Sequence, residues 1–299
     1  MTDRQLISKC DSEFYEKLCY VADELGLARA EGDREGNDIR IVLLSGPSCS
    51  GKTTAAKMLA DRLDDHGRRV VTVSIDDFYY DRGYLDKLSA RKGVDGIDYD
   101  SVDTIDLSCL ESFVAELLSK GSAQCPVFDF KTGNRNGSRE ISSDENTVFV
   151  FEGIQAIYPE ITRLLEPFGT VSVYISPQTP IAVGESVFDP NEIREMRRIV
   201  RDYNFRGASA EFTMTLWKSV RRNEDANIFP HVDGCTYRID STHDYEIGVL
   251  KPYLERILSE LCEDSVHYER ARAVLEKISS VTPIDASLIE EGSLYKEFV

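Results

Sequence analysis

The sequence predicts an α/β fold in which a mainly parallel sheet lies between two layers of helices. Short apolar, β-branched runs alternate along the chain with longer segments whose apolar residues recur every three to four positions. Such runs are typical of strands buried on both faces, and their alternation with helices is typical of a parallel sheet. With 299 residues, of which 41% are hydrophobic, the chain is long enough to bury a core of this kind.

The individual elements follow from local patterns of apolar residues. Strands are predicted at residues 39–44, 70–75, 147–151, 170–175 and 235–239. Helices are predicted at residues 4–27, 53–65, 107–118, 154–165, 191–203, 209–222 and 245–261. A hairpin is expected at about 126–142, around the turn Gly133–Gly137, and residues 82–105 are expected to form a long acidic loop.

The chain divides into three predicted parts. Residues 1–38 form an N-terminal helical extension that ends in a polar linker, Glu31–Asn37. Residues 39–262 form the main domain, which contains the hairpin insertion. Residues 263–299 form an acidic helical C-terminal tail, since residues 255–299 hold five Lys and Arg against ten Asp and Glu. This tail is expected to be a solvated helix with a frayed end.

The overall charge excludes some classes of partner. The chain has 35 Lys and Arg and 53 Asp and Glu, so its formal net charge is −18. Such a surface repels nucleic acids and anionic membranes, and neither is an expected partner. The seven cysteines include no C-x-x-C pair, which argues against a disulfide framework or a zinc site. Because the chain has no signal-peptide core and no apolar stretch of about 18 residues, it is expected in the cytoplasm.

A phosphate-binding loop follows the first predicted strand. The run GPSCSGKT, residues 46–53, matches G-x-x-x-x-G-K-[ST] between a strand and a helix, which predicts a P-loop NTPase fold that binds ATP with Mg²⁺. Glycines let backbone N–H groups approach phosphate oxygens, and the positive end of the helix dipole faces the anion. Lys52 reaches the β- and γ-phosphates, and the hydroxyl of Thr53 is a ligand for Mg²⁺. The residues expected to bind ATP in this loop are Gly46, Ser48, Ser50, Gly51, Lys52, Thr53 and Thr54.

Two carboxylates follow the second and third strands. Asp76 comes directly after the second strand, and Glu152 comes at the end of the third. Because ligands of parallel sheets bind beyond the carboxyl ends of the strands, both are expected near the phosphates. Asp76 is a candidate for the base that accepts a proton from an attacking hydroxyl, and Glu152 is a candidate Mg²⁺ ligand. The alternatives are an Asx turn with two solvated aspartates at residues 76–77, and a favourable charge at a helix N-terminus for Glu152.

Basic residues gather in one segment of this acidic chain. Residues 191–222 hold eight Lys and Arg against four Asp and Glu, a local balance of +4. The residues that lie at i, i+3, i+4 and i+7, and so share one helix face, are Arg194, Arg197, Arg198 and Arg201. Phosphates would compensate this cluster, which predicts an Arg-rich helical lid at about 185–210 over bound ATP. The alternative is a solvated face whose arginines pair with local acids.

Together, these motifs resemble the uridine kinase/phosphoribulokinase family of P-loop kinases, and within it the bacterial nucleoside kinases of the uridine kinase type. The resemblance spans about residues 39–262. The matching stretches are Gly46–Thr54, Ser74–Tyr80, Tyr99–Asp106, Pro126–Arg135, Phe151–Ile154, Arg197–Gly207 and Trp217–Pro230. The resemblance implies an ATP-dependent phosphotransferase with an alcohol acceptor that acts in nucleoside salvage.

The resemblance also implies roles on the catalytic and donor side. Asp76 matches the general base on the ribose 5′-hydroxyl. Arg198 matches an arginine that reaches both the acceptor and the phosphates, and Arg201 and Arg206 match arginines on ATP. Together with Lys52 and Mg²⁺, these arginines would balance charge in the transition state.

On the acceptor side, the resemblance implies four contacts to the nucleoside. Asp100 matches a carboxylate that binds ribose hydroxyls. Tyr79 matches an aromatic residue near the acceptor, and Phe128 and Phe130 match aromatics around the nucleobase. Glu152 matches the acidic residue near Mg²⁺.

Three positions depart from the family pattern. Gly133 stands where uridine–cytidine kinases commonly have a histidine that contacts the pyrimidine, and Phe128 replaces a tyrosine. Ala208 stands where an additional arginine is common. Because a pocket without hydrogen-bond partners discriminates poorly between bases, the base of the acceptor is left open.

The expected activity is transfer of the γ-phosphoryl group of ATP to the 5′-hydroxyl of a nucleoside, with uridine and cytidine as leading acceptors. The alternatives are a purine nucleoside, a sugar phosphate or a vitamin precursor as acceptor, or a nucleotide-binding regulator with little turnover. Five aspartates between residues 95 and 106 favour a neutral, hydroxyl-rich acceptor over a phosphorylated one. Whether the chain forms a homo-oligomer is left open.

Overall fold

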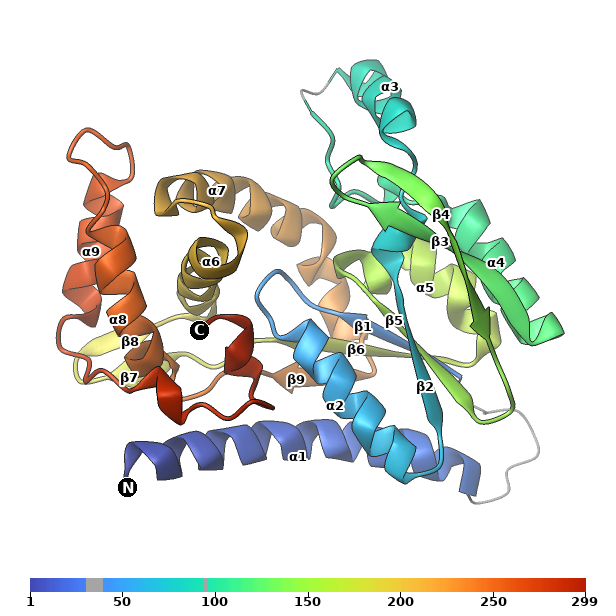
Figure 1. The fold of residues 1–299 in the computed structure, drawn as a ribbon, viewed down its shortest axis with the longest axis horizontal. Helices are drawn as coiled ribbons and strands as arrows, with labels where there is room; N and C mark the ends of the chain where they lie inside the picture. The colour runs from blue at the N-terminus through green and yellow to red at the C-terminus, as the bar shows by residue number, and fades with distance from the viewer. Residues whose placement is uncertain (31–39, 94–95) are drawn as a thin grey trace.

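The computed structural model describes residues 1–30, 40–93 and 96–299, and it contains the predicted parallel sheet (Figure 1). The five predicted strands run parallel to one another in the order β2-β5-β1-β6-β9. Their bounds are β1 Ile41–Ser45, β2 Arg69–Ser74, β5 Thr147–Glu152, β6 Thr170–Ser176 and β9 Tyr237–Asp240. Ile39 of the predicted first strand and the predicted linker Glu31–Asn37 lie outside the described residues.

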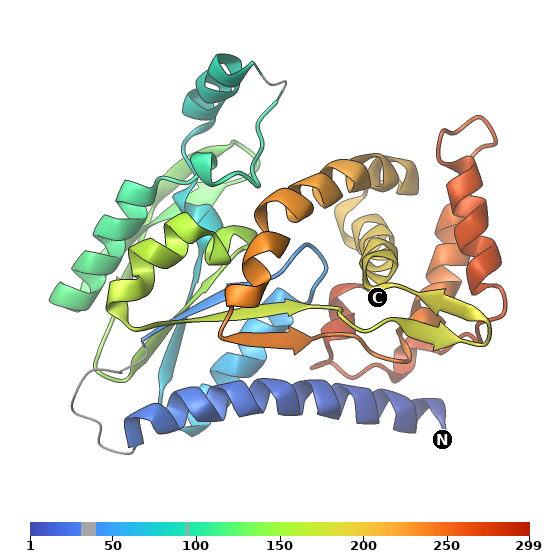
Figure 2. The ribbon, with the colours of Figure 1, turned by 180° about the vertical axis from the view of Figure 1, so that it is seen from behind.

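Helices cover both faces of this sheet. Their bounds are α1 Asp3–Ala30 and α2 Lys52–Asp65 on one face, and α4 Leu107–Lys120 and α5 Pro159–Leu165 on the other. Val42 and Leu44 of β1 pack with α1 and α2, whereas Ile41 and Leu43 pack with α4 and α5. Both sides of the strand are therefore buried, which explains its uninterrupted apolar run. Figures 1 and 2 show the long helix α1 running past α2 and the sheet edge at β9.

A further group of helices packs beside the sheet. The bounds are α6 Pro190–Arg206, α7 Ala210–Asn227, α8 Glu246–Leu258 and α9 Tyr268–Ile278. A short hairpin, β7 Ile181–Val183 and β8 Ser186–Phe188, joins their apolar cluster. Helix α6 is the predicted Arg-rich segment, and its apolar side, with Ile193, Met196 and Ile199, is buried in this cluster. Closure of α6 over a bound donor stays a prediction.

The predicted hairpin is formed by β3 Ser122–Asp129 and β4 Asn134–Ser142, which pair antiparallel. The prediction of a long loop at 82–105 is wrong in part, because residues Arg82–Lys92 form helix α3. Leu85 is the one buried residue that α3 contributes, so this helix has no apolar stripe that a sequence pattern could reveal.

Short 3₁₀ turns join several elements, and one of them divides a predicted helix. The predicted helix at 154–165 is the turn Ile154–Ile157 followed by α5, which begins with Pro159. The other turns are Ile75–Phe78, Val102–Thr104, Glu166–Phe168, Phe229–Gly234, Ala286–Leu288 and Leu294–Glu297. Across the described part of the chain, every helix is too short or too polar to cross a lipid bilayer.

The C-terminal residues are buried rather than frayed. After α9 the chain returns toward α1 and α2, and its last turn lies beside the start of α2 (Figure 1). Leu294, Tyr295 and Phe298 are at most 1% exposed and belong to the same apolar cluster as α1 and α2. The expectation of a solvated, frayed end is therefore wrong. The acidic Glu290 and Glu291 are exposed, so the charge of the segment concealed an apolar anchor.

Candidate active site

One cavity of about 890 Å³ collects most of the predicted site residues. It opens where β1, β2 and β5 end, which is the edge at which ligands of parallel sheets bind. The predicted residues that line it are Ser48, Ser50, Gly51, Lys52, Thr53, Asp76, Tyr79, Asp100, Phe130, Glu152, Arg198, Arg201 and Arg206. Three other predicted residues, Gly46, Thr54 and Phe128, lie outside this lining.

The phosphate loop joins β1 to α2 through two constrained glycines. Gly51 has a left-handed φ of 92° immediately before α2. At Gly46, an added Cβ atom would lie 2.1 Å from the carbonyl oxygen of Ile175, so a side chain has no room against β6. The Nζ atom of Lys52 donates to the carbonyl oxygens of Gly46 (2.7 Å) and Pro47 (3.2 Å). The loop therefore has the strand–turn–helix form that its motif predicts, with an ammonium group held over it.

Asp76 lies in the 3₁₀ turn after β2 and lines the cavity together with Lys52 and Glu152. Burial raises the pKa of Asp76 to about 6, and the negative charge of Glu152 acts in the same direction. The charge of Lys52 opposes both effects. A carboxylate with this pKa is ionised at neutral pH and is basic enough to accept a proton from a hydroxyl.

The neighbouring Asp77 has a structural position. Its carboxylate accepts from the backbone N–H of Phe128 (3.2 Å) and from the guanidinium of Arg139 (3.0 Å). It therefore ties the β3–β4 hairpin to the end of β2. The alternative of two solvated aspartates is wrong, because Asp77 is buried inside this contact.

Aromatic side chains form one wall of the cavity. The ring centroid of Phe128 lies 5.3 Å from that of Tyr79 and 5.2 Å from that of Phe130. Phe130 is 64% exposed and lines the cavity, whereas Phe128 is 7% exposed and packs behind the other two rings. Phe128 therefore supports the wall from behind, and its packing around a nucleobase stays a prediction.

A carboxylate and an amide lie together on the acceptor side. Asp100 Oδ2 accepts from Asn223 Nδ2 of α7 at 3.2 Å, and burial raises the pKa of Asp100. The loop that carries Asp100 is held by Tyr79, whose hydroxyl donates to the carbonyl of Tyr99 at 2.8 Å. The same hydroxyl accepts from Gln155 Nε2 at 2.8 Å. Asn223 was not identified as a site residue from the sequence. Its one indication was that it lies within Trp217–Pro230, a stretch that resembles the family.

Gly133 lies in the turn between β3 and β4, away from the lining of the cavity. Its φ of 70° is left-handed, and an added Cβ atom would lie 3.2 Å from the side chain of Arg82. Its N–H donates to the carbonyl of Asp129, and its own carbonyl accepts from the N–H of Arg82, both at 2.7 Å. A larger side chain would strain this turn, which accounts for glycine at this position.

Three arginines of α6 line the cavity and share one acid. Asp202 forms ion pairs with Arg198 (3.3 Å), Arg201 (2.7 Å) and Arg206 (3.7 Å). Arg201 also lies 3.4 Å from the hydroxyl of Ser48 in the phosphate loop. One carboxylate cannot neutralise three guanidinium groups, so among the described residues these arginines have fewer ion-pair partners than positive charges. This charge is placed to attract phosphates.

The other two arginines on the predicted helix face hold the phosphate loop in place. Arg194 and Arg197 are buried and form ion pairs with the buried Glu224 and Glu246, respectively. Each arginine also donates to a carbonyl oxygen of the phosphate loop at 3.2 Å. The alternative of a solvated face is wrong for Arg194 and Arg197, because this side of α6 packs on the loop, whereas its pairing with a local acid holds for the three arginines at Asp202.

The predicted Mg²⁺ ligands Thr53 and Glu152 both line the cavity. No group of three or more His, Cys, Asp or Glu that could hold a metal ion occurs among the described residues. Mg²⁺ in phosphoryl-transfer sites needs only one or two protein oxygens, because phosphates and water complete its coordination. A hydroxyl and a carboxylate beside the loop fit an ion that arrives with ATP.

A residue near the other end of the chain also reaches the phosphate loop. Glu297 Oε1 accepts from the backbone N–H of Thr54 at 2.9 Å and from its hydroxyl at 2.5 Å. The two residues are 243 positions apart. No motif signals such a contact, so sequence reasoning missed Glu297.

Comparisons with known proteins agree with this geometry. The Phosphoribulokinase / Uridine kinase family model matches residues 41–247. The chain is 28% identical over 179 residues to the uridine kinase of Ureaplasma urealyticum serovar 10, which covers 60% of this chain and 76% of that protein. It is also 28% identical over 171 residues to the uridine kinase of Lactobacillus helveticus, which covers 57% of this chain and 71% of that protein.

The solved structure of D-glycerate 3-kinase from Cryptococcus neoformans shares the fold. It matches with a TM-score of 0.53 at 18% identity, over 71% of this chain and 88% of that one. The region matched by the family model carries the sheet, the phosphate loop and the arginines of α6. The protein is a phosphotransferase with a hydroxyl acceptor, and it belongs to the phosphoribulokinase/uridine kinase family.

Proposed function

We propose that this protein transfers the γ-phosphoryl group of ATP to the 5′-hydroxyl of a nucleoside, with uridine and cytidine as the leading acceptors. The observation that carries the proposal is the single cavity that holds both the phosphate loop and Asp76. Relatives of the chain are named uridine kinases, which supports a nucleoside as the acceptor.

Asp76 is the proposed general base. As the acceptor oxygen attacks the γ-phosphorus, its proton passes to the Asp76 carboxylate. The bond from phosphorus to the acceptor oxygen forms, and the bond to the oxygen that bridges the β- and γ-phosphates breaks. The products are a nucleoside monophosphate and ADP.

Positive charge around the phosphate loop would stabilise the transferred group. Lys52 would contact the β- and γ-phosphates, and the three cavity arginines, which line the same cavity, would add positive charge beside them. Thr53 and Glu152 would hold Mg²⁺, which neutralises charge on the phosphate oxygens when it is bound.

The acceptor side of the cavity favours a neutral molecule with several hydroxyl groups. Asp98 and Asp100 both line this side, and a phosphorylated acceptor would be repelled by them. The paired Asp100 and Asn223 offer oxygen acceptors and an amide donor that suit two adjacent ribose hydroxyls. The exposed ring of Phe130 offers a surface for a base.

The test is ATP consumption with Mg²⁺ against uridine, cytidine, adenosine, guanosine, inosine and ribulose 5-phosphate, with the products identified by mass. We expect a nucleoside monophosphate from uridine or cytidine. Formation of product from a purine nucleoside or from the sugar phosphate alone would move the assignment to that acceptor. ATP binding without any acceptor-dependent turnover would contradict the proposal and favour a nucleotide-binding regulator.

A matched pair of variants tests the proposed base. Asp76→Asn keeps the size of the side chain but removes its basicity, so kcat should fall by about 10²–10⁴-fold. Asp86→Asn makes the same change at an exposed position of α3 and should leave kcat within about twofold. Equal rates for Asp76→Asn and the unmodified protein would remove Asp76 from this role.

A further inference from the structure

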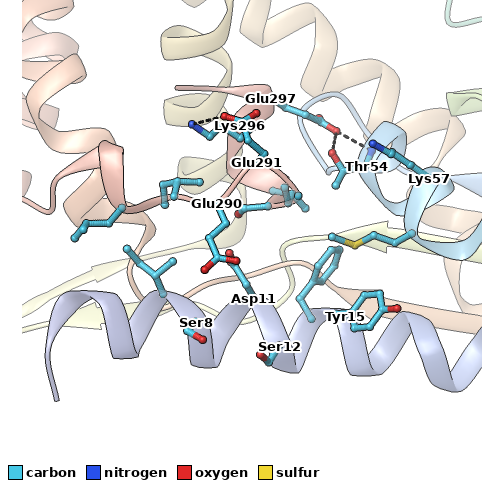
Figure 3. A pocket seen from close by; sticks show the side chains of 18 of the residues that line it. Ser8, Asp11, Ser12, Tyr15, Thr54, Lys57, Glu290, Glu291, Lys296 and Glu297 are labelled. Carbon is cyan, nitrogen blue, oxygen red and sulfur yellow. Dashed lines mark hydrogen bonds and ion pairs between the residues drawn. The ribbon is translucent and has the colours of Figure 1, made fainter. Parts of the chain in front are cut away.

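A second cavity, of about 950 Å³, lies between α1, α2 and the C-terminal residues 287–297 (Figure 3). Two of these three walls, α1 and the C-terminal residues, lie outside the region matched by the family model. This second cavity meets the active-site cavity at Thr53 and Glu297, which belong to both linings.

The order of residues along the phosphate loop gives a bound triphosphate its direction. Asp76 and residues 48–52 line the active-site cavity, whereas Thr54 lines the second cavity. The γ-phosphate must face Asp76 for the reaction, so the opposite end of the triphosphate points past Thr54. The nucleoside of the donor is attached to that end and is therefore directed toward the second cavity.

Glu297 stands at the junction of the two cavities. Its carboxylate accepts from the backbone N–H and the hydroxyl of Thr54, in the first turn of α2. Backbone N–H groups at this end of the helix are the groups that bind phosphate in a P-loop. The carboxylate thus occupies a place that suits a phosphate, and Figure 3 shows it reaching Thr54 from the C-terminal segment.

The lining of the second cavity suits an uncharged base and ribose better than phosphates. Tyr15, Met58 and Leu288, which are exposed or half-buried, provide apolar surface, and Asp11 and Glu290 point into the cavity (Figure 3). Carboxylates accept hydrogen bonds from ribose hydroxyls and exocyclic amino groups, whereas they repel phosphates. Five carboxylates line the cavity against three cationic side chains, Arg4, Lys57 and Lys296, and Lys296 forms an ion pair with Glu291 at 3.6 Å.

We propose that the second cavity binds the nucleoside part of the phosphate donor, and that Glu297 holds the adjoining phosphate position until the donor displaces it. The inference rests on the proposed function, because it takes ATP as the donor. It adds a site for the nucleoside of the donor, built in part from α1 and the C-terminal segment. It also means that Glu297 of that segment competes with a donor phosphate for the phosphate loop.

The test compares binding of ATP with binding of tripolyphosphate, which has the phosphates but no nucleoside, by titration calorimetry with Mg²⁺. Gly292 lines the second cavity, and an added Cβ atom there would meet no atom within 4 Å. Gly292→Trp should weaken ATP binding by about tenfold or more and change tripolyphosphate binding by less than about twofold. Gly234 is equally open but lines neither cavity, so Gly234→Trp should change neither affinity.

The Glu297→Gln variant tests the competition. Because a neutral amide competes less well than a carboxylate for the N–H of Thr54, both ATP and tripolyphosphate should bind about three- to tenfold more tightly. Unchanged or weaker binding of tripolyphosphate to this variant would overturn the role of Glu297.

A separate result would contradict the proposal that the donor nucleoside binds in the second cavity. If Gly292→Trp leaves ATP binding unchanged, or weakens ATP and tripolyphosphate equally, the nucleoside does not bind in the second cavity. If Gly292→Trp lowers the thermal stability, the same comparison is made with Ser287→Trp, because Ser287 is exposed and lines the same cavity. Because these measurements need no acceptor, a failure of the proposed nucleoside kinase activity would appear in the acceptor panel alone.

Discussion

Helix α6 carries two groups of arginines whose surroundings differ. The buried pair is Arg194 and Arg197. Arg197 pairs with Glu246 alone, and Arg194 pairs with Glu224, which also pairs with Arg221, although Arg221 has Asp225 as a second partner. The cavity group is Arg198, Arg201 and Arg206, which together have the single carboxylate of Asp202. The buried pair donates to carbonyl oxygens of the phosphate loop, whereas the cavity group lines the space beside that loop.

The difference teaches that the ratio of carboxylates to guanidinium groups separates a structural arginine from a binding one. In the buried pair each positive charge is neutralised, so the pair can be desolvated and can position the backbone of the loop. In the cavity group positive charge is left over, and an anionic ligand is needed to compensate it. One helix therefore both shapes the phosphate site and supplies its charge.

The largest expected effect comes from breaking the buried pair. Arg197→Met leaves Glu246 buried without its cation, so the free energy of unfolding should fall by about 3–5 kcal/mol, as measured in urea. Adding Glu246→Leu removes the stranded charge and should restore most of the loss. A loss below about 1 kcal/mol for the single variant would show that the pair is not what holds this region.

A member of the cavity group should behave in the opposite way. Arg198→Gln removes charge that would face the transferred phosphoryl group, so kcat/KM should fall by about 10²–10³-fold. Asp202 keeps Arg201 and Arg206 as partners, so the free energy of unfolding should change by less than about 1 kcal/mol. If this variant instead loses stability with normal kcat/KM, the distinction between the two groups fails.

The smallest effect concerns the proposed base, Asp76, whose pKa is raised to about 6. Because Asp76 must be ionised to accept a proton, and its pKa is raised to about 6, kcat/KM should fall about tenfold between pH 7 and pH 5. A profile whose midpoint lies near pH 4 would mean that burial does not shift this group.

The same pKa shift predicts the sign of a stability change. The folded-state pKa of Asp76 lies above its ordinary value of 3.8, so the ionised carboxylate costs stability once the pH exceeds 3.8, and the cost is complete above about 6. Asp76→Asn should therefore be more stable than the unmodified protein at pH 7, by about 1–3 kcal/mol, with a smaller gap at pH 5. Urea unfolding of both proteins at the two pH values measures this.

Much of the fold could be predicted because its signals are local. The strand β1 is apolar on both faces, and the phosphate loop needs glycines at fixed spacing, so both are visible within a few residues. Helix α3 could not be predicted, because it buries only Leu85 and has no apolar stripe. The packing of the C-terminal segment was missed for a related reason, since its acidic residues outnumber the few aromatics that anchor it.

The sequence by itself determined the parallel α/β sheet, the phosphate loop, and the candidate base Asp76 after the second strand. These depend on side-chain periodicity and on backbone geometry that only certain residues allow. The tertiary structure alone decided which arginines are structural, that Phe128 lies behind the cavity, and that Glu297 reaches Thr54. Those outcomes depend on which charges and rings meet across the fold, and residues far apart in the chain leave no local pattern that reveals their contact.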